Sequence, residues 1–273
     1  MVTLLCTVRD CRQPLAREER RLVCPRGHSF DVARSGYCNL LQPQDRRSRQ
    51  PGDSKEAVAA RRRFADRGFL EPLVRDMIET IRGPGTEDRG PVLDVGCGDG
   101  YHLAAFQKAL GGEGHGIDIS IPAIDAAAKR YRQCQFIIAN ADRFLPYAGR
   151  SFALVASITS RMNPGEFRRV IASNGTLLVA IPGPDDLIEL REAVLGEAKQ
   201  IDRADRTIEA FASDFTFLKH AQTRHVAHLD HQAIRDVMES SYRGLRTRQR
   251  ERLAALADLD VTLSRDLLVF TSS

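Results

Sequence analysis

The chain alternates short apolar runs with amphipathic segments from residue 91 onward. Helices are expected from about Tyr101 and from about Pro122, each after an apolar run that ends in turn residues. Two further strands are expected at 223–229 and 261–270, on either side of an arginine-rich helical segment. This alternation predicts an α/β fold with a parallel sheet and helices on both of its faces. The other predicted strands cover residues 91–96, 114–119, 134–139, 152–157 and 175–182.

The N-terminal part of the chain has a different pattern. Residues 1–40 are rich in Cys, Arg and turn residues and show no long helical period. A polar connector follows, and residues 55–81 carry apolar residues at near-helical spacing, which Gly68 and Pro72 divide into two predicted helices. We therefore expect three parts: a small module at 1–40, a linker with helices at 41–82, and a larger domain at 83–273.

Composition places the chain among soluble globular proteins. It has 273 residues, of which 42% are hydrophobic and 28% charged, a balance that excludes a disordered protein. No apolar run approaches the roughly 18 residues needed to cross a bilayer. Charged residues near the start interrupt any signal-peptide core. We expect a cytoplasmic protein that does not bind membranes.

Positive charge is concentrated at the N-terminal end. Residues 1–70 contain 15 Lys and Arg against 8 Asp and Glu, which leaves 25 against 28 in the rest of the chain. Such an excess on a small module is typical of a surface that binds a polyanion such as RNA. A solvated arginine-rich face explains the same excess, and charge alone does not separate the two.

Four potential metal ligands lie in the first 28 residues. They form two pairs with the spacings C-x4-C and C-x3-H, and they are Cys6, Cys11, Cys24 and His28. Three thiolates and an imidazole complete a tetrahedral zinc shell and leave no open position, so this zinc would be structural. It would supply the folding energy that about 40 residues cannot gain from burial alone. The alternative is a set of buried cysteines or a redox pair; Cys38 lies outside the pattern and is expected to be a packed thiol.

A glycine-rich turn follows the strand predicted at 91–96. The sequence Asp94-Val95-Gly96-Cys97-Gly98-Asp99-Gly100 leads from that strand into a helix, and Asp118 ends the next strand about 20 positions later. This arrangement resembles motif I of the S-adenosylmethionine (SAM)-dependent methyltransferases. A tight turn in an unrelated doubly wound fold is the alternative.

The resemblance implies a class I, Rossmann-type methyltransferase fold with a doubly wound, mostly parallel, seven-stranded sheet. It also implies that the glycine turn lies against the methionine part of SAM and that Asp118 holds both ribose hydroxyls. Ile119 and the Asn140-Ala141-Asp142 turn would line the adenine side. The cofactor-binding candidates in these segments are Asp94, Gly96, Cys97, Gly98, Asp99, Gly100, Asp118, Ile119 and Asp142.

Further sequence blocks narrow the resemblance. Together with the zinc ligands, the blocks at 24–31, 36–41, 47–54 and 60–64 resemble the bacterial 23S ribosomal RNA (guanine-N1)-methyltransferases. That family joins an N-terminal zinc module for RNA recognition to a methyltransferase domain. The resemblance implies large-subunit ribosomal RNA as the partner, a homodimer, and for some members protection against macrolides. Two more cofactor-binding candidates come from family positions: Leu70, where a tyrosine is usual, and Asp186, where a histidine is usual.

The chain departs from the family in two segments. Its first cysteine pair is wider than the family's C-x2-C, and residues 157–164, after the fourth strand, differ from the expected aromatic- or proline-containing segment. Thr159, Ser160 and Arg161 in that segment are our candidates for the catalytic pocket. An ordinary strand-to-helix loop is the alternative for these three residues.

Methyl transfer from a sulfonium is an in-line displacement, so the protein mainly positions the reactants and excludes water. Guanine N1 must lose its proton before or during transfer. Because N1 lies on the Watson–Crick edge, the target must be unpaired or flipped out, which favours a hairpin loop.

Two arginine clusters are RNA-contact candidates, with Tyr37 as a stacking surface. The second cluster would form the far wall of the substrate cleft, or a helix paired with Glu251 and Asp258. The first cluster comprises Arg46, Arg47, Arg49, Arg61, Arg62 and Arg63, and the second Arg243, Arg246, Arg248, Arg250 and Arg252.

Three functions fit the sequence. The first is SAM-dependent methylation of guanine N1 in a hairpin loop of 23S ribosomal RNA. The second keeps the fold but changes the substrate to another RNA or a small molecule. The third is a SAM-binding RNA module without catalysis, which the altered segment at 157–164 suggests.

Overall fold

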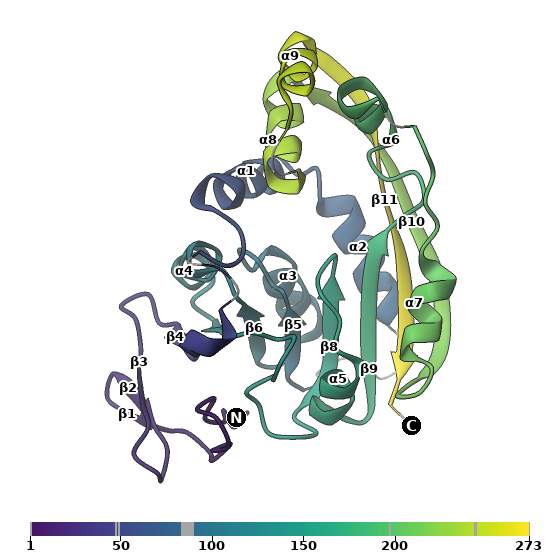
Figure 1. Cartoon of the computed structure of the whole chain (residues 1–273). Coiled ribbons are helices and arrows are strands. Elements are labelled where there is room, and N and C mark those ends of the chain that lie inside the picture. The colour runs from purple at the N-terminus through teal and green to yellow at the C-terminus, as the bar shows by residue number, and fades with distance from the viewer. Residues whose placement is uncertain are drawn as a thin grey trace.

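The computed structural model describes residues 2–46, 48, 50–82, 90–196, 198–242 and 245–272. Figure 1 shows one large twisted sheet with helices on both faces and a small N-terminal module at one edge. The large sheet has eight strands in the order β10-β11-β9-β8-β5-β6-β7-β4, and the module carries a three-stranded sheet in the order β1-β2-β3. None of the helices in these ranges combines the length and the apolar character needed to cross a membrane.

The centre of the large sheet is parallel, as predicted. β5 pairs with β6 on one side and with β8 on the other, and β7 and β9 extend the two halves outward. All five predicted strands of this part are confirmed. Their bounds are Val92–Val95 for β5, Gly114–Asp118 for β6, Cys134–Ile138 for β7, Phe152–Ile158 for β8 and Ile171–Pro182 for β9.

Two long antiparallel strands complete one side of the sheet. β11 (Asp258–Thr271) lies between β9 and β10 (Thr216–Asp230) and runs antiparallel to both. Both strands are longer than predicted. Most residues of β10 are exposed, and many of them are polar, so the strand continues beyond residues 223–229 without an apolar pattern to mark it.

The two helices predicted at 55–81 are confirmed. Gly68 and Pro72 do separate two helices, and Ser54 caps the first by accepting a hydrogen bond from the backbone N–H of Ala57. The helices are α1 (Lys55–Asp66), α2 (Glu71–Ile81), α3 (Tyr101–Leu110), α4 (Ile121–Arg130), α5 (Pro164–Val170), α6 (Ile188–Leu190), α7 (Ala204–Phe211), α8 (His231–Ser241) and α9 (Thr247–Ala255).

The N-terminal module is joined to the large sheet by a strand of its own. After β1 (Ala16–Glu18), β2 (Arg21–Val23) and β3 (Ser29–Asp31), the short strand β4 (Cys38–Asn39) pairs in parallel with β7. The sheet thus has the seven expected strands and an eighth from the module. The module is therefore fixed to the sheet edge by backbone hydrogen bonds.

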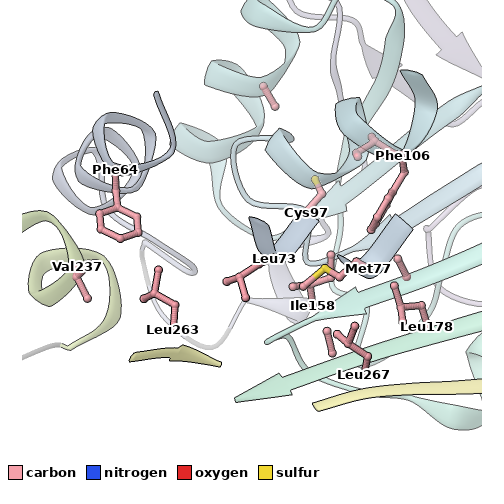
Figure 2. Close-up of a cluster of buried hydrophobic side chains, with 14 of the residues drawn as sticks. Phe64, Leu73, Met77, Cys97, Phe106, Ile158, Leu178, Val237, Leu263 and Leu267 are labelled. Atoms are coloured by element: carbon pink, nitrogen blue, oxygen red, sulfur yellow. The ribbon is translucent and has the colours of Figure 1, made fainter. Parts of the chain in front are cut away.

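Buried side chains form a core on each face of the sheet. On one face, α2, α3, α4 and α8 pack against the strands and α1 packs on α8, and Figure 2 shows Phe64, Val237 and Leu263 gathered in one part of this cluster. On the other face, Phe167 of α5 and Phe211 of α7 belong to a cluster that continues into the N-terminal module. Helices on both faces were predicted, and this prediction is confirmed.

An ion pair between a half-exposed arginine and a buried carboxylate joins α1 to α8. Arg63 donates to Asp236 with Nη2–Oδ1 at 2.6 Å, and the Asp236 side chain is only 1% exposed. A second pair between the same helices, Arg67 with Asp230, lies in solvent. The two pairs differ mainly in the burial of the carboxylate, so they form a matched comparison.

We predict that Arg63→Ala lowers the free energy of unfolding by about 3 kcal/mol, because it leaves a buried carboxylate without its cation. Arg67→Ala should change stability much less, because the Asp230 carboxylate is hydrated. Urea unfolding of both variants beside the wild type measures the difference. Equal losses for the two variants would contradict the assigned role of burial.

Candidate active site and metal centre

The four predicted metal ligands lie together in the N-terminal module. The ligand atoms of Cys6, Cys11, Cys24 and His28 all lie within 4.8 Å of one another. Cys11 Sγ is 3.8 Å from Cys24 Sγ, and His28 Nδ1 is 3.4 Å from the sulfurs of Cys6 and Cys24. A tetrahedral zinc ion would hold two sulfurs about 3.8 Å apart and a sulfur and a nitrogen about 3.5 Å apart. The cluster therefore fits structural zinc.

Local turns present these ligands. Cys24 and His28 flank a tight turn in which Gly27 has φ +82° and donates to the carbonyl of Cys24. The wider first pair is accommodated by left-handed backbone at Asp10 (φ 61°) and Arg12 (φ 48°). The fifth cysteine of the module, Cys38, is buried in β4 away from the cluster, and burial raises the pKa of its thiol to about 12.

A cavity of about 830 Å³ opens at the carboxyl ends of the parallel strands. Its walls come from the turns after β5, β6, β7, β8 and β9, from β11, and from the α1 and α8 side. The linker also contributes through Pro51, Gly52 and Asp53. In open α/β sheets a ligand binds in this position, beside the strand where the chain order reverses.

The glycine turn leaves space by having no side chains. Gly96 has φ +77°, and a Cβ there would lie 1.9 Å from Ser160 Oγ. Gly98 and Gly100 also have positive φ, and a Cβ at Gly100 would meet the Phe136 ring at 3.0 Å. Both the backbone conformation and the contacts with its neighbours therefore require glycine in this turn.

Three carboxylates surround the turn, and two of them, Asp94 and Asp99, are buried. Asp118 accepts hydrogen bonds from the backbone N–H groups of Gly98 and Ser120, and burial raises its pKa. Burial, followed by the charges of Asp118 and Asp99, raises the pKa of Asp94 to about 7. Both carboxylate oxygens of Asp94 are buried and lack a hydrogen-bond partner among the described residues. An acidic environment of this kind fits a cofactor that carries positive charge, as SAM does on its sulfonium and amino groups.

Most predicted cofactor residues line this cavity. Asp94 and Gly100 do not; Asp94 lies behind the turn and Gly100 packs on Phe136. The cavity is lined by the remaining candidates, Gly96, Cys97, Gly98, Asp99, Asp118, Ile119, Asp142, Leu70 and Asp186.

The three catalytic candidates lie at the end of β8 and also line the cavity. Thr159 has φ 49°, an unfavourable conformation for a β-branched residue, and Ser160 packs against Gly96. Arg161 Nη1 is 3.6 Å from the Asp142 carboxylate. The segment therefore lies directly beside the glycine turn.

The arginines after the linker face inward more than we expected. Arg61 lines the cavity, forms a 2.7 Å ion pair with Asp53, and lies close to Gly98. Arg62 lies 4.0 Å from the Asp99 carboxylate, and Arg63, whose side chain is half exposed, pairs with the buried Asp236 carboxylate. Each of the three arginines therefore lies beside a carboxylate of the chain itself.

The other RNA-contact candidates are distributed over the surface. Arg46 is exposed and Tyr37 is half-buried near the zinc module. Arg246, Arg248, Arg250 and Arg252 belong to α9 or its cap and do not line the cavity, whereas Tyr242 does. Arg47, Arg49 and Arg243 fall outside the described residues.

No sequence pattern identified two residues of the cavity, His102 and Arg265. Burial and the nearby Arg265 and Arg61 lower the pKa of His102 to about 4, so its imidazole is neutral at pH 7. Arg265 comes from β11, far along the chain from the glycine turn. Only the pairing of β11 with β9 brings it to the cavity.

We predict that Cys24→Ser loses the bound zinc, because one of four ligands is removed, and that Cys38→Ala retains it. Metal content per chain, measured by elemental analysis, and thermal unfolding test this directly. Loss of zinc from both variants, or from neither, would argue against the assigned ligand set.

For the cofactor, Asp118→Asn should weaken binding of S-adenosylhomocysteine by about 10- to 100-fold, because charge-assisted hydrogen bonds to the ribose are lost. Asp125→Asn is the control, since that carboxylate lies on α4 and pairs with Lys129. Calorimetric titration gives both affinities. An unchanged affinity in Asp118→Asn would exclude the ribose contact.

Comparisons with known proteins agree with this geometry. The family described as a methyltransferase domain matches residues 92–178, and the family described as "RlmA, N-terminal", a zinc ribbon, matches residues 5–49. The solved YcgJ protein from Bacillus subtilis is 15% identical, with a TM-score of 0.52 over 73% of this chain and 97% of its own; this likeness concerns the fold alone.

Sequence relatives are more specific. A Streptomyces fradiae protein named "23S rRNA (guanine(748)-N(1))-methyltransferase" is 35% identical over 229 residues, which cover 82% of this chain and 80% of the relative. YxjB of Bacillus subtilis (strain 168) is 29% identical over 274 residues, 97% of this chain and 95% of the relative. The zinc ribbon, the SAM-dependent methyltransferase domain and this identity together show that the chain belongs to the family of 23S rRNA (guanine-N1)-methyltransferases.

Proposed function

We propose that the protein transfers a methyl group from SAM to N1 of a guanine in a hairpin loop of 23S ribosomal RNA. The observation that carries this proposal is the fixed position of the Cys3His module beside the cavity, through the pairing of β4 with β7. A small-molecule methyltransferase has no need of such a module. The family of the chain supports the same substrate.

The chain's residues have distinct tasks in this reaction. Asp118 binds the ribose hydroxyls, and the glycine turn admits the amino-acid part of SAM. When bound, SAM supplies an activated methyl carbon. Thr159 and Ser160, at the end of β8, form the wall between the glycine turn and the acceptor, where they orient the base and exclude water.

We further propose the three-part division at 1–40, 41–82 and 83–273, with the first part as the RNA-recognition module. Tyr37, a half-buried residue of this module, and the exposed Arg46 of the linker are the candidate RNA contacts. We also propose a cytoplasmic location and, from the family resemblance, a homodimer. Light scattering of the purified protein tests the dimer.

The experiment is transfer of radiolabelled methyl from SAM to protein-free 23S ribosomal RNA, with the modified position mapped by reverse-transcription stops. We expect one strong stop at a guanine in a hairpin loop, because an N1-methyl group blocks base pairing. Asp118→Asn serves as the control with impaired cofactor binding. If the wild type binds SAM but labels neither RNA nor precursor ribosomal particles, the protein is a SAM-binding module without this activity.

A further inference from the structure

The strand order divides the cavity into a cofactor half and an acceptor half. Asp118 ends β6, the glycine turn follows β5, and the sheet continues through β8 to β9 and β11. Neighbouring strands lie about 4.8 Å apart, so the end of β9 is about 10 Å from the end of β5. With the ribose at Asp118 and the methionine at the glycine turn, the cavity beyond β8 is left for the acceptor base.

A carboxylate and a guanidinium form an ion pair in this acceptor half. Asp186, after β9, and Arg265, on β11, both line the cavity, with Arg265 Nη1 2.5 Å from Asp186 Oδ1. The side chains are 8% and 18% exposed. Asp186 Oδ1 also accepts from the backbone N–H of Ser264, and Arg265 Nη1 donates to the Ser264 carbonyl. Both side chains are therefore held in place on β11 before any substrate binds.

The hydrogen-bonding groups of this pair complement the Watson–Crick edge of guanine. Guanine presents N–H donors at N1 and N2 and an acceptor at O6, which suit a carboxylate and a guanidinium respectively. A guanidinium has five N–H donors, and the contacts above use Nη1, so Nη2 and Nε provide further donors. Adenine has an acceptor at N1 and a donor at N6, the opposite pattern.

We propose, on the basis of the proposed function, that Asp186 and Arg265 read the target guanine and that Asp186 receives its N1 proton. The bond from N1 to the methyl carbon forms as the carbon–sulfur bond breaks, and that electron pair stays on sulfur. The N1 proton passes to the Asp186 carboxylate and then to water. Arg265 stabilises the negative charge that develops on O6 as the proton leaves.

Other charged groups surround the pair and bear on its pH dependence. The neighbouring carboxylate of Asp185 is paired with Arg224 of β10 and accepts from Ser264 Oγ. His102 of α3 also lines the cavity, and burial, followed by the charges of Arg265 and Arg61, lowers its pKa. Glu189 of α6 accepts from Thr262, and Arg191 lines the same wall. Asp185 does not line the cavity, which makes it the natural control.

The test compares Asp186→Asn with Asp185→Asn on a hairpin RNA that the wild type methylates. We expect Asp186→Asn to reduce the transfer rate at pH 7 by about 100-fold or more, with part of the loss recovered at alkaline pH, where guanine N1 loses its proton to solvent. Asp186→Glu should restore part of the rate at pH 7. Asp185→Asn should keep the wild-type rate and pH profile, since both aspartates bond to β11 but only one faces the cavity.

Asp186, a cofactor-binding candidate by its family position, contacts the acceptor instead in this proposal. S-adenosylhomocysteine binding is therefore the second readout, and it should be unchanged in Asp186→Asn. A weakened cofactor affinity would assign Asp186 to the cofactor and overturn the proposal, as would a rate loss without recovery at high pH. If the transfer rate of His102→Gln recovers at alkaline pH and that of Asp186→Asn does not, His102 is the group that receives the N1 proton. Should Asp186→Asn fail to fold, Arg265→Gln decides, because a full rate at pH 7 in that variant contradicts the pair.

Failure of this inference and failure of the proposed function are distinguishable. If the wild type labels no guanine N1 in any RNA, the proposed function is wrong. If the wild type labels a guanine and Asp186→Asn does so at the same rate, only the assignment of the pair is wrong.

Discussion

The reversal of strand order at β5 is the constraint on which the rest of the structure depends. The chain runs outward from β5 through β6 to β7, and then returns to the other side of β5 for β8 and β9. The helices on the two sides therefore leave the sheet in opposite directions and open a crevice at the carboxyl end of β5. The glycine turn lies in that crevice, and the Gly98 amide bonds there to Asp118 of the next strand.

Buried acidic groups give the crevice its chemical character. Burial raises the pKa of Asp94, Asp99 and Asp118, and the charges of Asp118 and Asp99 raise that of Asp94 further. Part of this charge is balanced by Arg61 and Arg62 of α1, which reach the turn from the N-terminal side. The helix that follows the linker thus serves as an electrostatic cover as well as a wall, and the α1–α8 ion pair holds that cover in place.

The sequence was informative wherever chemistry leaves a local signal. Glycine spacing identified the turn because positive φ and close packing require glycine there, and cysteine spacing identified the metal ligands because short loops chelate tetrahedral ions. Contacts between distant segments leave no such signal. Arg265 reaches the cavity only through the pairing of β11 with β9, and the two-residue strand β4 is too short to show a period. Arg61 resembled a free basic residue because its partner, Asp53, was read as part of a linker.

The pairing of β4 with β7 attaches the zinc module to the large sheet. Asn140, in the cavity wall, donates to the carbonyl of Asp45, and Leu40 donates to the carbonyl of Ile138, so the chain leaving the zinc module is bonded to the cavity wall after β7. A recognition module on a flexible tether could search many positions for a suitable base. Under the proposed function, a module attached in this way would set the distance between the RNA that it binds and the cavity, so an RNA whose stem holds its loop at another distance would not bring a base to the site.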